Sequence, residues 1–126
     1  NERLGDQIDK FLRAIEPGAA WERLNWGLSR SPELNQHPEC DIPLLKPPYD
    51  LDQVWVRRED QVLFRLPKTE ALIFGINILN ISVAEIAADK DGRNGLRMAV
   101  ETMPDKIAKY KNIQDSREHL LGLLKD

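Results

Sequence analysis

The chain has 126 residues, which is enough for one domain with a modest core and too few for two ordinary domains. Hydrophobic residues at 41% and charged residues at 31% are near globular averages, and no apolar run approaches the roughly 20 residues of a bilayer helix, so composition indicates neither disorder nor a membrane span. The net charge is −3 and the basic residues form no stripe, so we expect no nucleic-acid partner.

The beginning of the chain and its cysteine content suggest its setting. The single cysteine, Cys40, cannot form an internal disulfide, and no signal sequence opens the chain, so we expect a cytoplasmic protein. The first residue is not methionine and a helical pattern begins almost at once. We therefore expect the chain to be a piece of a longer protein, in which residues outside this piece contribute part of the core.

The N-terminal segment predicts a helix and then a strand. Apolar residues between Leu4 and Ile15 recur on one side of a helix that ends at Pro17 and Gly18. The segment from Ala19 to Ser29 alternates with period two and predicts a half-buried strand. Its second face carries three residues that indicate more than a solvated surface: Trp21, Arg23 and Asn25.

The middle of the chain predicts an irregular excursion and a hairpin. Five prolines between Ser31 and Asp50 exclude regular structure there, and the excursion is either a surface insertion or a functional flap. Leu51 to Leu66 and Ala71 to Ile81 then predict two antiparallel strands. The second of these is apolar almost throughout, which indicates that both of its faces are covered.

The C-terminal third predicts helices. Ser82 begins a short helix with Glu85 in the capping-box position, and the segment from Asp91 to Gly95 predicts a turn. An apolar stripe from Leu96 to Ile107 predicts a helix bent or broken at Pro104, and a last helix starts near Ser116. The whole order predicts an α+β fold built on an antiparallel three-stranded meander, with an N-terminal helix and C-terminal helices.

The second predicted strand has an unusual polar face. Alternation places Arg57, Glu59, Gln61 and Arg65 on one side. If the hairpin turn centres near Lys68, Gln61 lies opposite Gly75 and Glu59 opposite Asn77, with apolar walls from Trp55, Leu63 and Ile73. Convergent polar groups among apolar walls are typical of a small-molecule pocket, and the alternative is a solvated face with cross-strand ion pairs.

Other chemical motifs are weak. His37 and His119 have no cysteine or carboxylate at metal-ligand spacing, so we predict no zinc site, and no nucleophile elbow or phosphate-binding glycine loop is present.

Several runs together resemble a known family. The pattern R-x-E-x-Q-x-L-x-R-L-P from Arg57 to Pro67, followed by ALIFGIN, is similar to the heme-dependent oxidative N-demethylase alpha-subunit-like family. The run Arg23-Leu24-Asn25-Trp26 after an ERLG-type helix and the later Met103-Pro104 and Tyr110-Lys111 pairs look like that family's landmarks in the same order.

The resemblance implies a PAS-like heme-binding domain, of which residues 1–126 are the C-terminal part, forming a single domain. It implies an oxidoreductase of the monooxygenase type that removes a methyl group from a small amine, using heme and electrons from a flavin and iron-sulfur reductase. It also implies an axial histidine upstream of Asn1, so the fragment by itself is expected to be inactive. The chain departs from the family pattern at Asp60 and Asn77, where cations are common.

The candidate pocket residues are those of the polar faces and their neighbours: Arg23, Asn25, Arg57, Glu59, Gln61, Arg65 and Asn77. Three functions are compatible with them. The first is the heme-dependent oxidoreductase, in which Glu59 or Arg57 orients a cationic substrate or a heme propionate. The second is a non-catalytic sensory module that binds a small ligand in the same pocket. The third is a subunit-interaction fragment, including a homo-oligomer formed through the sheet edge.

Overall fold

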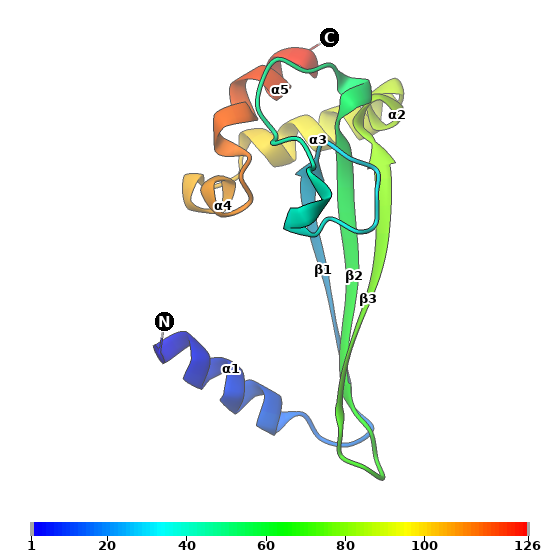
Figure 1. Cartoon of the computed structure of the whole chain (residues 1–126), viewed down its shortest axis with the longest axis vertical. Coiled ribbons are helices and arrows are strands. Elements are labelled where there is room, and N and C mark those ends of the chain that lie inside the picture. The colour runs from blue at the N-terminus through cyan, green and yellow to red at the C-terminus, as the bar shows by residue number, and fades with distance from the viewer. Residues whose placement is uncertain (1, 126) are drawn as a thin grey trace. The chain divides into compact units, whose positions relative to one another are not determined.

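The predicted α+β fold is confirmed. The computed structural model describes residues 2–125, and their side chains from residue 5 onward. Three antiparallel strands form one sheet in the order β1-β2-β3, with one helix before them in the chain and helices after them (Figure 1). Among the described residues, no helix combines the length and the apolar character that crossing a membrane requires.

The elements follow one another in a simple order. The helices and strands are α1 (Glu2–Ala14), β1 (Ala20–Ser29), β2 (Trp55–Arg65), β3 (Leu72–Ser82), α2 (Val83–Ala88), α3 (Lys90–Glu101), α4 (Asp105–Tyr110) and α5 (Arg117–Leu123). Three short 3-10 helices lie at Pro38–Cys40, Leu51–Gln53 and Gln114–Ser116. The proline-rich excursion is irregular apart from the first of these, as its composition predicts.

The chain divides into two compact units. Unit 1 comprises residues 1–25 and Glu59–Asn77, and unit 2 comprises Trp26–Arg58 and residues 78–126. Each strand therefore contributes one part to unit 1 and another part to unit 2.

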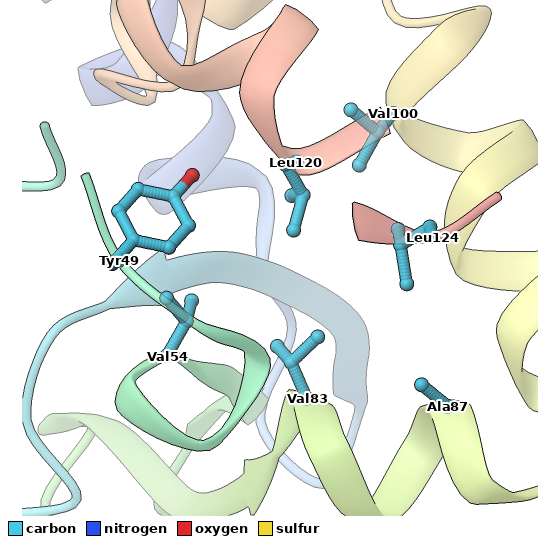
Figure 2. Packing of buried hydrophobic residues seen from close by; sticks show 7 residues of the cluster. All are labelled: Tyr49, Val54, Val83, Ala87, Val100, Leu120 and Leu124. Atoms are coloured by element: carbon cyan, nitrogen blue, oxygen red, sulfur yellow. The ribbon is translucent and has the colours of Figure 1, made fainter. Parts of the chain in front are cut away.

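Unit 2 contains the main hydrophobic core. Val54, Val83, Val100 and Leu120 are completely buried, and Leu124 is almost so. Figure 2 shows these side chains with Tyr49 and Ala87; they come from residues 49–54, from α2 and α3, and from α5 and its C-cap. Each buried aliphatic side chain of this size contributes roughly 1.5–3 kcal/mol relative to exposure.

The proline-rich excursion is held to the strands of unit 2 by polar contacts with its main chain. Asn80 Nδ2 donates to the carbonyl of Pro32 at 2.7 Å, and Arg57 Nη1 donates to the carbonyl of Glu33 at 3.4 Å. These contacts satisfy carbonyl groups that an irregular segment cannot pair within itself.

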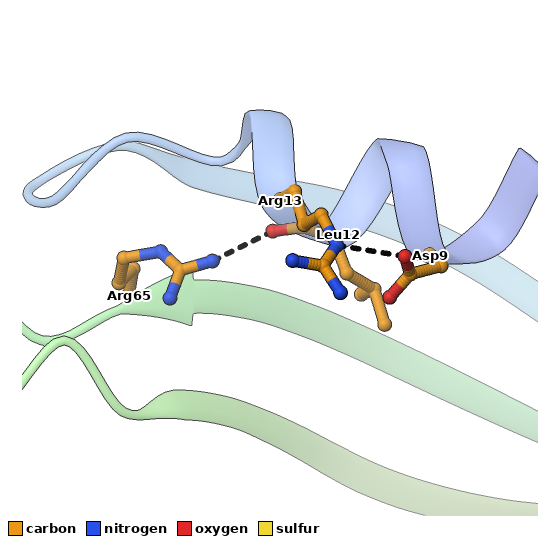
Figure 3. Close-up of polar contacts among 4 residues, drawn as sticks. All are labelled: Asp9, Leu12, Arg13 and Arg65. Atoms are coloured by element: carbon orange, nitrogen blue, oxygen red, sulfur yellow. Dashed lines mark hydrogen bonds and ion pairs between the residues drawn. The ribbon is translucent and has the colours of Figure 1, made fainter.

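In unit 1, Arg65 connects β2 to the end of α1 (Figure 3). Its Nη2 donates to the Leu12 carbonyl at 2.7 Å and its Nε to the Ile15 carbonyl at 2.8 Å, while Nη1 reaches the Glu70 carbonyl at 2.7 Å. The last carbonyls of a helix have no partner within the helix, and a cation there is favoured by the helix dipole. Arg65 therefore fixes where α1 ends.

Two local predictions in the C-terminal third are wrong. Asp91 to Gly95 is not a turn but the first part of α3, because the Asp89 carboxylate accepts from the Gly92 N–H at 2.7 Å and caps the helix there. Ser82 is the N-cap of α2, but its side chain makes no capping hydrogen bond, so the predicted capping box is not formed. The break at Pro104 is confirmed, since α3 ends at Glu101 and Pro104 precedes α4.

The predicted hairpin register is wrong by one residue. The Leu66 N–H donates to the Ala71 carbonyl at 2.9 Å, so the turn centres between Lys68 and Thr69 rather than on Lys68. A Cβ on Gly75 would lie 2.9 Å from Val62 Cγ1, so Gly75 lies against Val62 and not against Gln61. A shift of one residue moves every side chain of a strand to the other face, and Asn77 therefore shares the Val62 face.

Candidate functional site

Unit 1 contains a pocket of about 570 Å³ between α1 and one face of the sheet. This volume is within the range of pockets that hold small organic ligands. The lining comprises three residues of α1, three of β1, three of β2 and two of β3: Ile8, Phe11, Leu12, Trp21, Glu22, Arg23, Gln61, Val62, Leu63, Leu72 and Phe74. Most of these side chains are hydrophobic or aromatic, so the walls are apolar.

The apolar wall of the pocket forms because the helix stripe and the strand alternation face one another. On α1, Ile8, Phe11 and Leu12 recur at the spacing of one helix side. Phe11 meets Trp21 of β1 edge to face, with ring centroids 5.5 Å apart and planes at 75°. Aromatic pairs of this geometry stabilise by about 0.5–1.5 kcal/mol beyond the area they bury.

A chain of polar contacts crosses from β1 to β2 beside this wall. Arg23 Nε donates to Gln61 Oε1, and Gln61 Nε2 donates to Glu59 Oε2 at 2.9 Å. Asn25 Nδ2 donates to the same Glu59 oxygen at 3.2 Å. Arg23 beside Gln61 and Asn25 beside Glu59 define one antiparallel register and one shared face, which we call the pocket face. Four of the predicted pocket residues are therefore brought together.

Gln61 occupies the centre of this network. It is 7% exposed, and both ends of its amide are hydrogen-bonded. A buried amide with both ends satisfied has one orientation, because reversing it would place a donor against Arg23. Gln61 therefore fixes the position of the Arg23 guanidinium at the pocket.

The other predicted candidates lie elsewhere. Arg65 anchors the end of α1 through three main-chain carbonyls and does not line the pocket. Arg57 belongs to unit 2, where it contacts the proline-rich excursion. Asn77 is exposed and lies on the face opposite Gln61, because of the register described above.

The predicted apolar walls are corrected in the same way. Leu63 lines the pocket, as expected. Ile73 has the same strand parity as Gly75 and therefore lies on the other face, and Trp55 belongs to unit 2.

Sequence reasoning did not assign the pocket residues of α1 and β3. Phe11 and Leu12 of α1 and Leu72 and Phe74 of β3 line the pocket, but they read in the sequence as parts of an ordinary helix stripe and an apolar strand. One signal was present, because Trp21 lies on the polar side of β1 where a solvated face would carry no large aromatic residue.

The pocket suits part of a heme group. Its apolar wall fits the body of a macrocycle, and Arg23 suits a propionate, because a guanidinium matches the planar carboxylate. None of the lining residues in the described chain carries an imidazole, thiol, thioether or phenol, which are the usual axial ligands of heme iron. Over residues 2–125, no group of three or more His, Cys, Asp or Glu residues is placed to hold a metal ion. The lining therefore fits the macrocycle and its carboxylate but does not supply an axial ligand.

The comparison with protein families agrees with the resemblance seen in the sequence. The family described as "Haem-dependent oxidative N-demethylase, alpha subunit-like" matches residues 1–121, which is nearly the whole chain. The match covers both compact units, including the pocket of unit 1 and the core of unit 2. The chain belongs to the heme-dependent oxidative N-demethylase alpha-subunit-like family.

Proposed function

We propose that the chain is the C-terminal part of a PAS-like heme domain that oxidatively demethylates a small amine. The observation that carries this proposal is the family match over residues 1–121. The pocket of unit 1 supports it, because an apolar cavity next to a fixed guanidinium suits an amphipathic cofactor.

The overall reaction has a defined balance. One methyl group leaves the nitrogen as formaldehyde, and one oxygen atom of O₂ enters that product. The other oxygen atom takes up two protons and leaves as water. Two electrons are consumed, and a flavin and iron-sulfur reductase is the class of partner that supplies them. Heme, when bound, supplies the oxygen-activating chemistry.

The residues of this chain bind and orient. Phe11, Trp21 and Phe74 offer an apolar surface to the body of a ligand, and Arg23 holds a carboxylate beside them. Glu59 is the anionic member of the network, and its carboxylate supports recognition of a protonated amine. Because Asn25 and Gln61 both donate to Glu59, the carboxylate is held in one place.

The test uses the full 126-residue chain and heme. We expect added heme to produce a Soret band distinct from that of free heme, and dimethylamine to change it more than the neutral analogue dimethyl ether. Glu59→Gln should abolish the difference between amine and ether while heme binding remains. Glu16→Gln is the matched control, because Glu16 is an exposed carboxylate that does not line the pocket.

Three results decide the matter. A Soret band that is the same with and without protein would overturn heme binding. Equal responses to the amine and the ether would overturn recognition of the amine. Loss of the difference in both the Glu59 and the Glu16 variants would overturn the role of Glu59. A homo-oligomer formed through the sheet edge stays a prediction.

A further inference from the structure

Unit 2 contains a pocket of its own, in which the end of the proline-rich excursion lies against the segment that leads from α4 to α5. Its volume is about 310 Å³, at the small end of the range for ligand pockets. The lining comprises three residues of the excursion, one of α4 and three of the segment after α4: Leu44, Leu45, Lys46, Lys109, Asn112, Gln114 and Asp115. Five of these seven side chains are polar or charged, so the pocket of unit 2 suits a small hydrophilic ligand.

The main chain on both sides of this pocket is held in place. Ser116 is completely buried, and its hydroxyl donates to the Leu45 carbonyl at 2.6 Å. Ile113 is also completely buried, and its N–H donates to the Ala108 carbonyl at 2.8 Å. The two walls are therefore joined before any ligand arrives, and binding does not have to order the main chain.

Three charged side chains of this pocket make no contact with the protein that would use up their charge. Among the described residues, the side chains of Lys46, Lys109 and Asp115 form no hydrogen bond and no ion pair. All three are exposed. The two lysines come from different walls, because Lys46 belongs to the excursion and Lys109 to α4. The pocket therefore offers two separate ammonium groups and one carboxylate to a ligand.

This set of charges selects one class of ligand. Two ammonium groups on different walls match two separate carboxylates, and the carboxylate of Asp115 attracts an ammonium group and repels a further anion. An acidic amino acid carries these three groups. Its single net negative charge balances the single net positive charge of Lys46, Lys109 and Asp115. The side-chain amides of Asn112 and Gln114 supply both donors and acceptors for the remaining polar atoms.

We infer that the pocket of unit 2 binds an acidic amino acid, with its two carboxylates at Lys46 and Lys109 and its ammonium group at Asp115. Because the three side chains are exposed, water screens each contact, and we expect a dissociation constant on the order of 1 mM. The inference goes beyond the proposed function, since every residue of this pocket belongs to unit 2 and none of them takes part in the proposed oxidation.

The first arm of the test titrates three probes into the full chain and follows amide chemical shifts by NMR: glutamate, glutarate and free lysine. Glutarate lacks the ammonium group, and free lysine has the opposite net charge. We expect glutamate to bind most tightly and to shift the amides of residues 44–46 and 109–115. Its binding should weaken as salt is added, because the contacts are ionic.

The second arm tests the three charges one at a time. Lys46→Gln and Lys109→Gln should each weaken the binding of both glutamate and glutarate by about threefold. Asp115→Asn should weaken glutamate and strengthen glutarate, because the substitution removes both the attraction for the ammonium group and the repulsion of the carboxylates. Lys106→Gln is the matched control, since Lys106 is an exposed lysine of α4 that does not line the pocket.

The inference is overturned if no probe gives a saturable shift, or if glutarate binds the unmodified chain as tightly as glutamate. It is also overturned if the Lys106 variant loses as much affinity as the Lys46 and Lys109 variants, or if Asp115→Asn leaves the ratio of the two affinities unchanged. Circular dichroism reports whether each variant folds. If one does not, the order of the three probes on the unmodified chain and the remaining variants decide. Failure of the amine response of the heme complex, with glutamate binding intact, would overturn the proposed function alone.

Discussion

At the scale of single residues, Arg65 illustrates how an arginine in a binding pattern can have a structural role. It donates to three main-chain carbonyls, those of Leu12, Ile15 and Glu70, and Figure 3 shows the contact with Leu12. We expect Arg65→Met to lower the free energy of unfolding by about 2 kcal/mol, because hydrogen bonds from a charged donor contribute more than neutral ones. Urea denaturation followed by circular dichroism measures this.

The same helix offers a matched control. Arg13 pairs with Asp9 at 2.7 Å, and that contact raises the pKa of Arg13, but both side chains are largely exposed. We expect Arg13→Met to change stability little, because exposed pairs are screened by water. Equal losses for the two variants would contradict the anchoring role of Arg65.

Tyr49 links stability to pH. It is 3% exposed, and burial raises its pKa above the ordinary value near 10, with smaller opposing effects from Ser116 and Arg30. The unfolded chain therefore loses the phenolic proton at lower pH than the folded chain. Stability from this group is complete below pH of about 10 and is lost as the pH rises through the folded-state pKa.

We expect the urea midpoint to fall more steeply above pH 10 in the unmodified chain than in Tyr49→Phe. Tyr110→Phe should keep the steep fall, because Tyr110 is 82% exposed. Below pH 9, Tyr49→Phe should cost little, since the Tyr49 hydroxyl has no hydrogen-bond partner among the described residues and the Ser116 hydroxyl donates to the Leu45 carbonyl. Parallel curves for all three proteins would refute the linkage.

At the scale of elements, the pairing of β2 with β3 depends on Gly75. A Cβ at this position would approach Val62 Cγ1 to 2.9 Å, and a β-branched valine has little rotamer freedom to move aside. We expect Gly75→Ala to destabilise the chain by about 1 kcal/mol, as overpacking does. The same substitution in a Val62→Ala background should not change the free energy of unfolding. Chemical denaturation of the unmodified chain, the two single variants and the double variant gives the coupling free energy between the two positions.

Gly27 of β1 is the control for this cycle. A Cβ there would meet no atom within 4 Å, so Gly27→Ala should be neutral or slightly stabilising, since alanine restricts the unfolded chain. A cost for Gly75→Ala that persists without the Val62 side chain would mean that the register of β2 and β3 is different.

At the scale of the whole molecule, the two units differ in how much apolar surface they bury. Among the described side chains, Ile15 is the one buried hydrophobic residue of unit 1, whereas ten buried hydrophobic residues belong to unit 2. We expect amide hydrogens of α1 to exchange at least about tenfold faster than those of α3, because local stability follows buried apolar contacts. Hydrogen exchange measured by mass spectrometry on peptides from the two helices tests this, and equal protection would contradict it.

The elements and the family could be predicted from the sequence because their signals are local. The period of α1 and β1, the prolines of the excursion and the apolar β3 depend on neighbours in the chain, and these elements formed close to the expected bounds. The helical start of α3 was missed because Asp89 caps Gly92, and this contact outweighs the low helix propensity of two glycines.

The sequence alone determined the fold class, the polar face of β2 and the position of Trp21 on the same face of β1 as Arg23 and Asn25. The tertiary structure decided which polar residues meet. It brings together four of them: Arg23, Asn25, Glu59 and Gln61. Arg65 instead hydrogen-bonds to main-chain carbonyls at the end of α1, and Asn77 lies on the opposite face of the sheet. The physical reason is that alternation determines the face of a residue only relative to its own strand. The register between strands depends on a turn and a glycine whose contacts are distant in sequence.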